Sequence, residues 1–250
     1  MKKFGLIGHP IEHSLSPALF KAGYDGKYPY DLIQTADFEE AYARFLEEYD
    51  GINVTAPFKE LAIKKADILS EECQKIGATN LLIKTPEGIK AHNSDYLGLR
   101  LWIEKIARPE SKVLVVGLGG AGKAATQAAR SSGHQVILMN RTQHTDEIRP
   151  LSEFREAFKA ADIIIYNLPV RLPELDILGK EDFIESKRKH ILEANYRNPS
   201  FDKELIKKLT EIHPQLEYTS GETWLLMQAL TGYEIFTGEK PDLEKMAARL

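Results

Sequence analysis

Four short stretches in the first hundred residues place polar side chains where apolar runs end. They are "HSLSP" (13–17), "NVTAPFK" (53–59), "ATN" (78–80) and "HNSD" (92–95). Each stretch alone is typical of a cap or turn, because Ser, Thr and Asn side chains bond to nearby backbone groups. Their recurrence is informative, since open α/β sheets bind ligands at the carboxyl ends of their strands. Hydroxyls, amides, one lysine and one aspartate suit a small polyhydroxylated substrate that carries a carboxylate.

The stretch "VLVVGLGGAGKAA" (113–125) indicates a dinucleotide-binding turn. Gly117, Gly119 and Gly122 have G-x-G-x-x-G spacing and lie between an expected strand and an expected helix. In that context the glycines allow a tight turn, a close approach of backbone to a pyrophosphate, and close packing of helix on sheet. The phosphates then lie at the positive N-terminus of the helix. The alternative is a glycine-rich turn with a purely structural role.

The end of the next strand indicates which dinucleotide is bound. NAD-binding proteins usually place Asp or Glu there to bind the ribose 2′-hydroxyl. This chain has Asn140, Arg141 and Thr142 instead. The planar guanidinium of Arg141 suits a 2′-phosphate, so NADP is favoured over NAD. The alternative is a solvated surface arginine.

These residues belong to an alternating pattern of short apolar strands and amphipathic helices, which predicts an α/β protein with a mostly parallel sheet. The segment "RPESK" (108–112) is the best boundary between two units, and helix 221–238 has the character of the first unit, to which the chain is expected to return. Expected strands are 3–8, 30–35, 51–55, 113–117, 135–140, 162–166 and 189–196, with a hairpin over 79–95. Expected helices are 16–26 with Ser16 as N-cap, 38–49, 58–77 in two pieces, 96–107, 121–132, 152–159 and 180–185.

Composition excludes several classes of protein. Hydrophobic residues at 43% and charged residues at 28% are typical of soluble globular chains. The net charge of −4 argues against a duplex-binding protein. Cys73 is the only cysteine, which excludes an internal disulfide and fits a reducing cytoplasm. The sequence shows no signal-peptide core, no membrane-spanning run and no metal-ligand spacing among its histidines, so we expect no membrane partner and no metal.

Several motifs in order give the chain a family resemblance. These are "GLIGHPIEHSLSP", "GINVTAPFK", "GATN", "NSDYLG", "VGLGGAGKAA", "NRT", the region of Tyr196, and "QAL" (228–230). The chain resembles the shikimate dehydrogenases, which reduce 3-dehydroshikimate to shikimate reversibly with NADP in the biosynthesis of chorismate and aromatic amino acids. The resemblance implies a substrate-binding catalytic domain over 1–101 and 222–250, and a Rossmann-type NADP-binding domain over 102–221.

The resemblance also implies roles for individual residues. Ser14 and Ser16 would hold the substrate carboxylate, and Thr55, Asn80 and Gln228 would bind substrate hydroxyls, with Tyr196 nearby. Lys59 and Asp95 would form the catalytic pair for hydride transfer at substrate C3. Residues implied in NADP binding are Gly117, Gly119, Gly120, Ala121, Gly122, Asn140, Arg141, Thr142 and, beside the nicotinamide, Gly221.

The chemistry explains why a lysine stands at position 59. Oxidising a secondary alcohol requires removal of a proton from oxygen as hydride leaves carbon, and reducing the ketone requires its return. A free amine with a pKa of about 10.4 is a poor base at neutral pH. Burial lowers the pKa of an amine and a neighbouring carboxylate raises it, so we treat Lys59 and Asp95 as one titrating pair. The alternatives are a solvated lysine opening a helix, and an Asp95 that caps helix 96–107.

Two other functions are weighed against this one. A quinate/shikimate dehydrogenase with relaxed use of NAD and NADP differs by one substrate hydroxyl. Two departures from the family bear on it, because Tyr96 replaces a glycine and Thr145 stands where a second basic residue often follows "NRT". A non-catalytic ligand-sensing relative is the second alternative, and the intact Lys59 and Asp95 argue against it. We expect a monomer or a homodimer.

Overall fold

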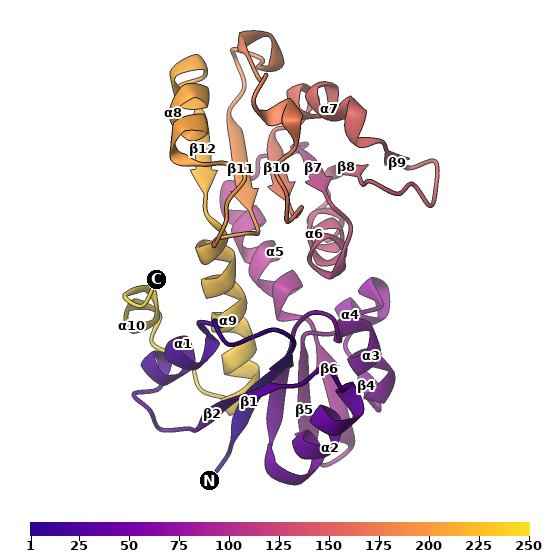
Figure 1. Ribbon diagram of the computed structural model, residues 1–250, viewed down its shortest axis with the longest axis vertical. Helices are drawn as coiled ribbons and strands as arrows, with labels where there is room; N and C mark the ends of the chain where they lie inside the picture. The colour runs from indigo at the N-terminus through magenta and orange to yellow at the C-terminus, as the bar shows by residue number, and fades with distance from the viewer. The chain divides into compact units, whose positions relative to one another are not determined.

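The computed structural model describes residues 1–250, which form two compact units, 1–99 with 225–250 and 100–224 (Figure 1). The chain passes from one unit to the other inside two helices, α5 (Ser94–Ile106) and α9 (Gly221–Thr237). The segment 108–112, expected to be the boundary, lies within the second unit instead. The reason is that α5 continues unbroken past the division, so the proline-containing segment only ends the helix.

The first unit contains a six-stranded sheet with strand order β2-β1-β3-β5-β6-β4. Strand β1 (Phe4–Gly8) pairs in parallel with β2 (Tyr30–Gln34) and β3 (Gly51–Val54). Strands β5 (Leu81–Thr85) and β6 (Gly88–His92) form the expected antiparallel hairpin, and β5 also pairs antiparallel with β3. The carboxyl ends of β3 and β6 therefore lie at the same edge of the sheet as the amino end of β5.

Helices cover both faces of this sheet (Figure 1). Leu81 packs in a cluster with residues of α1 (Ser16–Gly23), α9 and α10 (Leu243–Ala247), whereas Leu82 packs in a cluster that includes α2 (Phe38–Glu48). Successive side chains of a strand point to opposite faces, so neighbouring leucines serve the two cores. The register of the hairpin is thereby fixed, because a slip of one residue would exchange the faces.

The second unit contains a six-stranded parallel sheet with order β12-β11-β10-β7-β8-β9. Its strands are β7 (Lys112–Val116), β8 (Gln135–Met139), β9 (Ile148–Arg149), β10 (Ile163–Tyr166), β11 (Lys189–Glu193) and β12 (Leu216–Thr219). This is the order of a doubly wound nucleotide-binding fold, in which ligands bind where the strand order reverses, here beside β7. Three helices complete the unit together with its share of α5 and α9, namely α6 (Gly120–Ser131), α7 (Phe154–Ala160) and α8 (Lys203–Ile212).

The two helical pieces expected over 58–77 are confirmed, with an unexpected strand between them, whereas the helix expected over 180–185 is corrected. The helix over 58–77 is interrupted after α3 (Lys59–Ala62) by β4 (Ile68–Leu69) and resumes as α4 (Glu71–Ile76). The cause is backbone pairing with β6, in which the amide of Ser70 donates to Ala91. Residues 180–185 form only a 3₁₀ turn over Lys180–Asp182, in which the Asp182 carboxylate accepts from the amide of Gly179.

Two expected caps are also corrected. Ser16 is the first residue of α1, and no side-chain cap precedes this helix. The cap of α5 is Asn93, whose Oδ1 accepts from the amide of Tyr96 at 3.1 Å, while Asp95 lies inside the first turn. Four elements have no counterpart among the expected ones, α8, α10, β9 and β12. No helix combines the length and apolar character needed to cross a bilayer.

The carboxylate of Glu72 holds the segment that leads into α5. Its Oε1 accepts from the amide of Asn93 at 3.4 Å and lies 3.4 Å from Nδ1 of His92. Burial acts to raise the pKa of Glu72, but the hydrogen bonds from His92 and backbone amides outweigh it and lower the pKa to about 2. The deprotonated carboxylate therefore stabilises the fold.

We predict that this stabilisation is lost in acid. The pKa of Glu72 in the folded state lies below its ordinary value of 4.5, so the stabilisation is complete above that pH and disappears as the pH falls through about 2. In urea unfolding at pH 7, Glu72→Gln should lower the free energy of unfolding by about 2 kcal/mol. The difference in the free energy of unfolding between variant and wild type should shrink progressively as the pH falls from 4.5 to about 2. A difference that stays constant with pH would contradict this assignment.

Candidate active site

Lys59 and Asp95 form an ion pair at the polar edge of the first sheet. Lys59 is the first residue of α3, shortly after β3, and Asp95 is the second residue of α5, shortly after β6. Nζ of Lys59 donates a hydrogen bond to Oδ2 of Asp95, and the two side chains are 17% and 14% exposed. The pair is therefore shielded from bulk water yet accessible to a small ligand. The N-terminal turn of α5 also favours a negative charge at Asp95.

Backbone contacts tie together the segments that carry this pair. The amide of Thr79 donates to the carbonyl of Lys59 at 3.1 Å. The hydroxyl of the same threonine donates to the carbonyl of His92 at 2.6 Å, and its side chain is fully buried. Thr79 therefore links the start of α3 to the segment that precedes α5.

A network of amides and one hydroxyl lies beside the ion pair. Oδ1 of Asn80 accepts from the amide of Ser94 at 2.7 Å, and Nδ2 of Asn80 donates to the Ser94 hydroxyl at 2.9 Å. That hydroxyl donates in turn to Oε1 of Gln228 at 3.1 Å, and Nε2 of Gln228 donates to the carbonyl of Leu225. The residues Asn80 and Gln228, expected to bind substrate hydroxyls, are thus joined through Ser94. Ser94 directly precedes Asp95 in the chain, so the network and the ion pair share the first turn of α5.

Asn53 supports this network and was not among the expected site residues. Its Nδ2 donates to the carbonyl of Asn80 at 3.2 Å, and its Oδ1 accepts from the hydroxyl of Tyr30 at 2.8 Å. Asn53 is buried within β3. An amide inside an otherwise apolar strand was the signal in the sequence, because a buried polar side chain requires hydrogen-bond partners.

Ser14 and Ser16 form a second polar group in the same unit. Their hydroxyl oxygens are 3.1 Å apart, and the amide of Ser16 donates to the Ser14 hydroxyl at 3.2 Å. The carbonyl of Ser16 accepts from the hydroxyl of Tyr233, and burial raises the pKa of that tyrosine. Tyr233 therefore remains a neutral donor that fixes the serine turn. Thr55 follows β3, and its amide donates to Ile7 at 2.9 Å.

The glycine-rich turn of the second unit has the geometry that phosphate binding requires. Gly117 has a positive φ of 86°, and an added Cβ at Gly122 would lie 1.9 Å from the carbonyl oxygen of Gly117. By contrast, no atom lies within 4 Å of a Cβ added at Gly119, so this residue faces open space. Gly120 and Ala121 begin α6, whose N-terminus has no side-chain cap. Its first amides are available to an anion.

The ends of β8 and β10, the two strands that flank β7, lie beside this turn. Asn140 follows β8, and its Oδ1 accepts from the amide of Leu118 in the glycine turn at 3.4 Å. Arg141 and Thr142 follow and are exposed. Oδ1 of Asn167, directly after β10, is buried without a hydrogen-bond partner. A ligand that donates to this atom would remove the cost of leaving it unpaired. An open glycine, free helix amides and an unpaired amide oxygen fit a dinucleotide.

Gly221 and Tyr196 lie near the end of β11, in the second unit. An added Cβ at Gly221 would lie 2.4 Å from the carbonyl oxygen of Ala194, so only glycine allows this approach. Tyr196 is half-buried, and burial raises its pKa. Glu193 holds the intervening loop, since its carboxylate accepts from the amides of Ser200 and Phe201. The remaining residues expected to bind substrate or act in catalysis all lie in the first unit: Ser14, Ser16, Thr55, Lys59, Asn80, Asp95 and Gln228.

Comparisons with known families describe both halves of the chain. Residues 6–82 match the shikimate dehydrogenase substrate binding domain. Residues 84–211 match the NAD binding domain of the D-isomer specific 2-hydroxyacid dehydrogenases.

Individual relatives give the same result. The shikimate dehydrogenase (NADP(+)) of Ignicoccus hospitalis is 30% identical, with 99% of this chain and 97% of that protein covered. The similarly named protein of Thermotoga maritima is 36% identical over 146 residues, which cover 56% of this chain and 55% of that protein. The structure of Thermus thermophilus shikimate 5-dehydrogenase in complex with NADP(H) and shikimate is 27% identical, with a TM-score of 0.81 and coverage of 100% and 98%. The chain therefore belongs to the shikimate dehydrogenase family.

Proposed function

We propose that this protein is an NADP-dependent shikimate dehydrogenase, which interconverts 3-dehydroshikimate and shikimate in aromatic amino acid biosynthesis. The observation that carries the proposal is the shielded ion pair of Lys59 and Asp95 beside the Asn80–Ser94–Gln228 network. A cation and a carboxylate next to several amide and hydroxyl groups suit a cyclic acid with several hydroxyls. The Ignicoccus relative, whose name includes NADP, supports the choice of cofactor.

The polar residues of the first unit bind and orient the substrate. The paired hydroxyls of Ser14 and Ser16 donate to the substrate carboxylate. Thr55, Asn80 and Gln228 bind the ring hydroxyls, and Tyr196 is the remaining residue that we assign to substrate binding. Because the amides of Asn80 and Gln228 are already held through Ser94, little side-chain entropy is lost when the substrate binds.

Lys59 handles the proton of the reaction. When the alcohol is oxidised, Nζ of Lys59 accepts the hydroxyl proton, and when the ketone is reduced, the ammonium returns a proton to the oxygen. Asp95 positions the amine through their hydrogen bond. The pair therefore acts as a proton donor and acceptor held at a fixed place.

The second unit would hold NADP, which when bound would supply or accept the hydride at substrate C3. The pyrophosphate is held by the turn of Gly117, Gly119, Gly120, Ala121 and Gly122. Asn140, Arg141 and Thr142 bind the adenosine end, where the exposed guanidinium of Arg141 meets the 2′-phosphate. Gly221 lies beside the nicotinamide, and the absence of a side chain there lets the start of α9 approach the backbone after β11 closely.

The single cysteine bears on the compartment in which the protein works. Cys73 is free and buried, so the fold needs no oxidising compartment, and we propose that the protein works in the cytoplasm. We propose a monomer or a homodimer as its functional form.

Replacing Lys59 tests the assignment of the proton-transfer group. Lys59→Ala should lower kcat for shikimate oxidation by about 10²–10⁴-fold, because general acid–base catalysis is lost, while KM changes much less. Lys64→Ala, an exposed lysine of the adjoining turn, is the matched control and should behave as wild type. Turnover is followed by the absorbance of the reduced nicotinamide, with shikimate and quinate compared as substrates. Near-normal kcat in Lys59→Ala would remove the proposed mechanism, and turnover of neither substrate by wild type would indicate a non-catalytic protein.

Replacing Arg141 tests the assignment of the 2′-phosphate. Arg141→Ala should raise KM for NADP by about tenfold or more and change KM for NAD little, because only NADP presents a phosphate to the guanidinium. Arg130→Ala, an exposed arginine that pairs with Glu147 in the same unit, is the control. Steady-state kinetics with each dinucleotide provide the measurement. Equal losses with NADP and NAD would show that Arg141 does not read the phosphate.

A further inference from the structure

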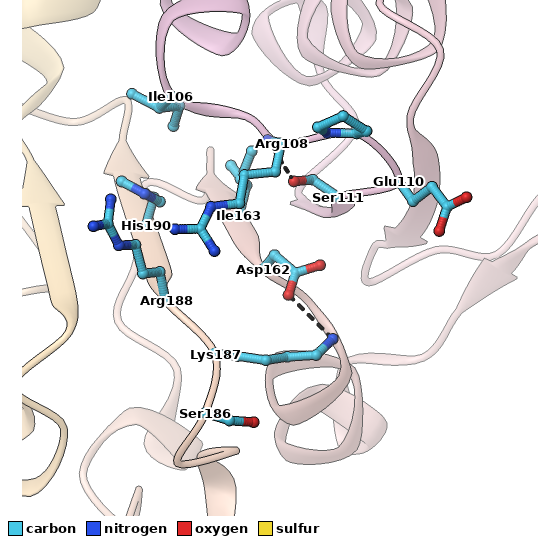
Figure 2. A pocket seen from close by; sticks show the side chains of 11 residues that line it. Ile106, Arg108, Glu110, Ser111, Asp162, Ile163, Ser186, Lys187, Arg188 and His190 are labelled. Carbon is cyan, nitrogen blue, oxygen red and sulfur yellow. Dashed lines mark hydrogen bonds and ion pairs between the residues drawn. The ribbon is translucent and has the colours of Figure 1, made fainter.

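A cavity lies within the nucleotide-binding unit, at the amino ends of its strands (Figure 2). Its volume is about 290 Å³, and its walls come from the segment after α5, the start of β10, and the segment that leads into β11. Because the strands are parallel, this edge is opposite to the edge that carries the glycine-rich turn. The cavity is therefore distinct from the dinucleotide site.

The acidic side chain at the centre of this cavity is already neutralised. Oδ1 of Asp162 lies 3.2 Å from Nζ of Lys187, and Oδ2 of Asp162 accepts from the amide of Lys112 at 2.9 Å. Figure 2 shows the ion pair between Asp162 and Lys187 along the wall. Asp162 therefore leaves little negative charge to repel an anion, and the carboxylate of the other acidic lining residue, Glu110, points away from Arg108 and Arg188 in Figure 2.

Two arginines on the walls have no carboxylate partner, namely Arg108, just after α5, and Arg188, just before β11. Both are exposed, and Figure 2 shows both side chains extending toward His190. After the larger effect of burial, the positive charges of Arg188 and Arg108 contribute to lowering the pKa of His190, against the opposing effect of Glu217. The two guanidinium groups thus act on one small region, in a chain whose net charge is −4.

A hydroxyl donor lies on the same wall. Oγ of Ser111 accepts from the amide of Arg108 at 3.0 Å, and Ser111 is buried. The hydroxyl proton of Ser111 remains available to donate to a ligand. The wall therefore offers two planar guanidinium groups and one hydroxyl, all of them donors.

We propose that this cavity binds a small anion that carries a phosphate group. A phosphate presents enough oxygen atoms to accept hydrogen bonds from two guanidinium groups and the Ser111 hydroxyl together. The two oxygen atoms of one carboxylate are used up by a bidentate pair with a single guanidinium. The volume lies at the lower end of the range for ligand pockets, which suits a small metabolite and not a dinucleotide. The bound anion joins the segment 108–111 to the segment 186–190 and so stabilises the second unit.

Isothermal titration of the full chain with inorganic phosphate and pyrophosphate tests this proposal. Wild type should show a binding component that becomes about tenfold weaker or more in Arg108→Ala and in Arg188→Ala. The same component should persist in Arg141→Ala, which removes an exposed arginine of the dinucleotide site and one equal positive charge. Both cavity arginines are exposed, so the variants should fold, which circular dichroism verifies.

Three results would overturn the proposal. The first is the absence of any binding component that depends on Arg108 or Arg188. The second is an equal loss in Arg141→Ala, which would place the anion at the adenosine end of the dinucleotide site, beside Arg141. The third is binding of malonate as tight as that of pyrophosphate, which would assign the cavity to carboxylates. None of these results bears on turnover, so they leave the dehydrogenase assignment to its own tests.

Discussion

The ion pair of Lys59 and Asp95 depends on the register of three strands. Asn53 of β3 faces Leu81 of β5, and Leu81 faces His92 of β6. This register brings the end of β3, the start of β5 and the end of β6 to one edge, so the residues that follow or precede them can meet. The alternation of Leu81 and Leu82 between two cores holds the register. The geometry of the site thus rests on apolar packing away from it.

The second unit uses the two edges of its sheet differently. At the carboxyl edge, glycines and free helix amides offer partial positive charge without side chains, which suits close contact with a dinucleotide. At the amino edge, side chains supply the positive charge, from Arg108 and Arg188 around a cavity. Full charges reach farther than amide dipoles but are less closely fixed, so we infer a smaller and more weakly held ligand there.

The sequence alone was sufficient to predict the elements with strong hydrophobic periodicity and the dinucleotide-binding turn. Strand pattern, glycine spacing and helix pattern are all local features of the sequence. The helix α8 had such a signal too, with Leu205 and Leu209 at helical spacing and Asp202 as its cap, and was overlooked. Contacts between distant residues could not be read from the sequence. The support of Asn80 by Asn53 and the approach of Arg108 to the segment of Arg188 both depend on strand order and register. The roles of the site residues remain predictions.

The central claim is that Lys59 and Asp95 act as one proton-handling unit, and a double-mutant cycle on turnover tests it most directly. The kcat of Lys59→Ala, of Asp95→Ala and of the double variant is measured with shikimate and NADP. Residues that act as a unit have strongly non-additive effects. We predict that the double variant turns over about as slowly as Lys59→Ala alone. A double variant whose loss equals the product of the two single losses would show that the residues act independently, and would contradict the account.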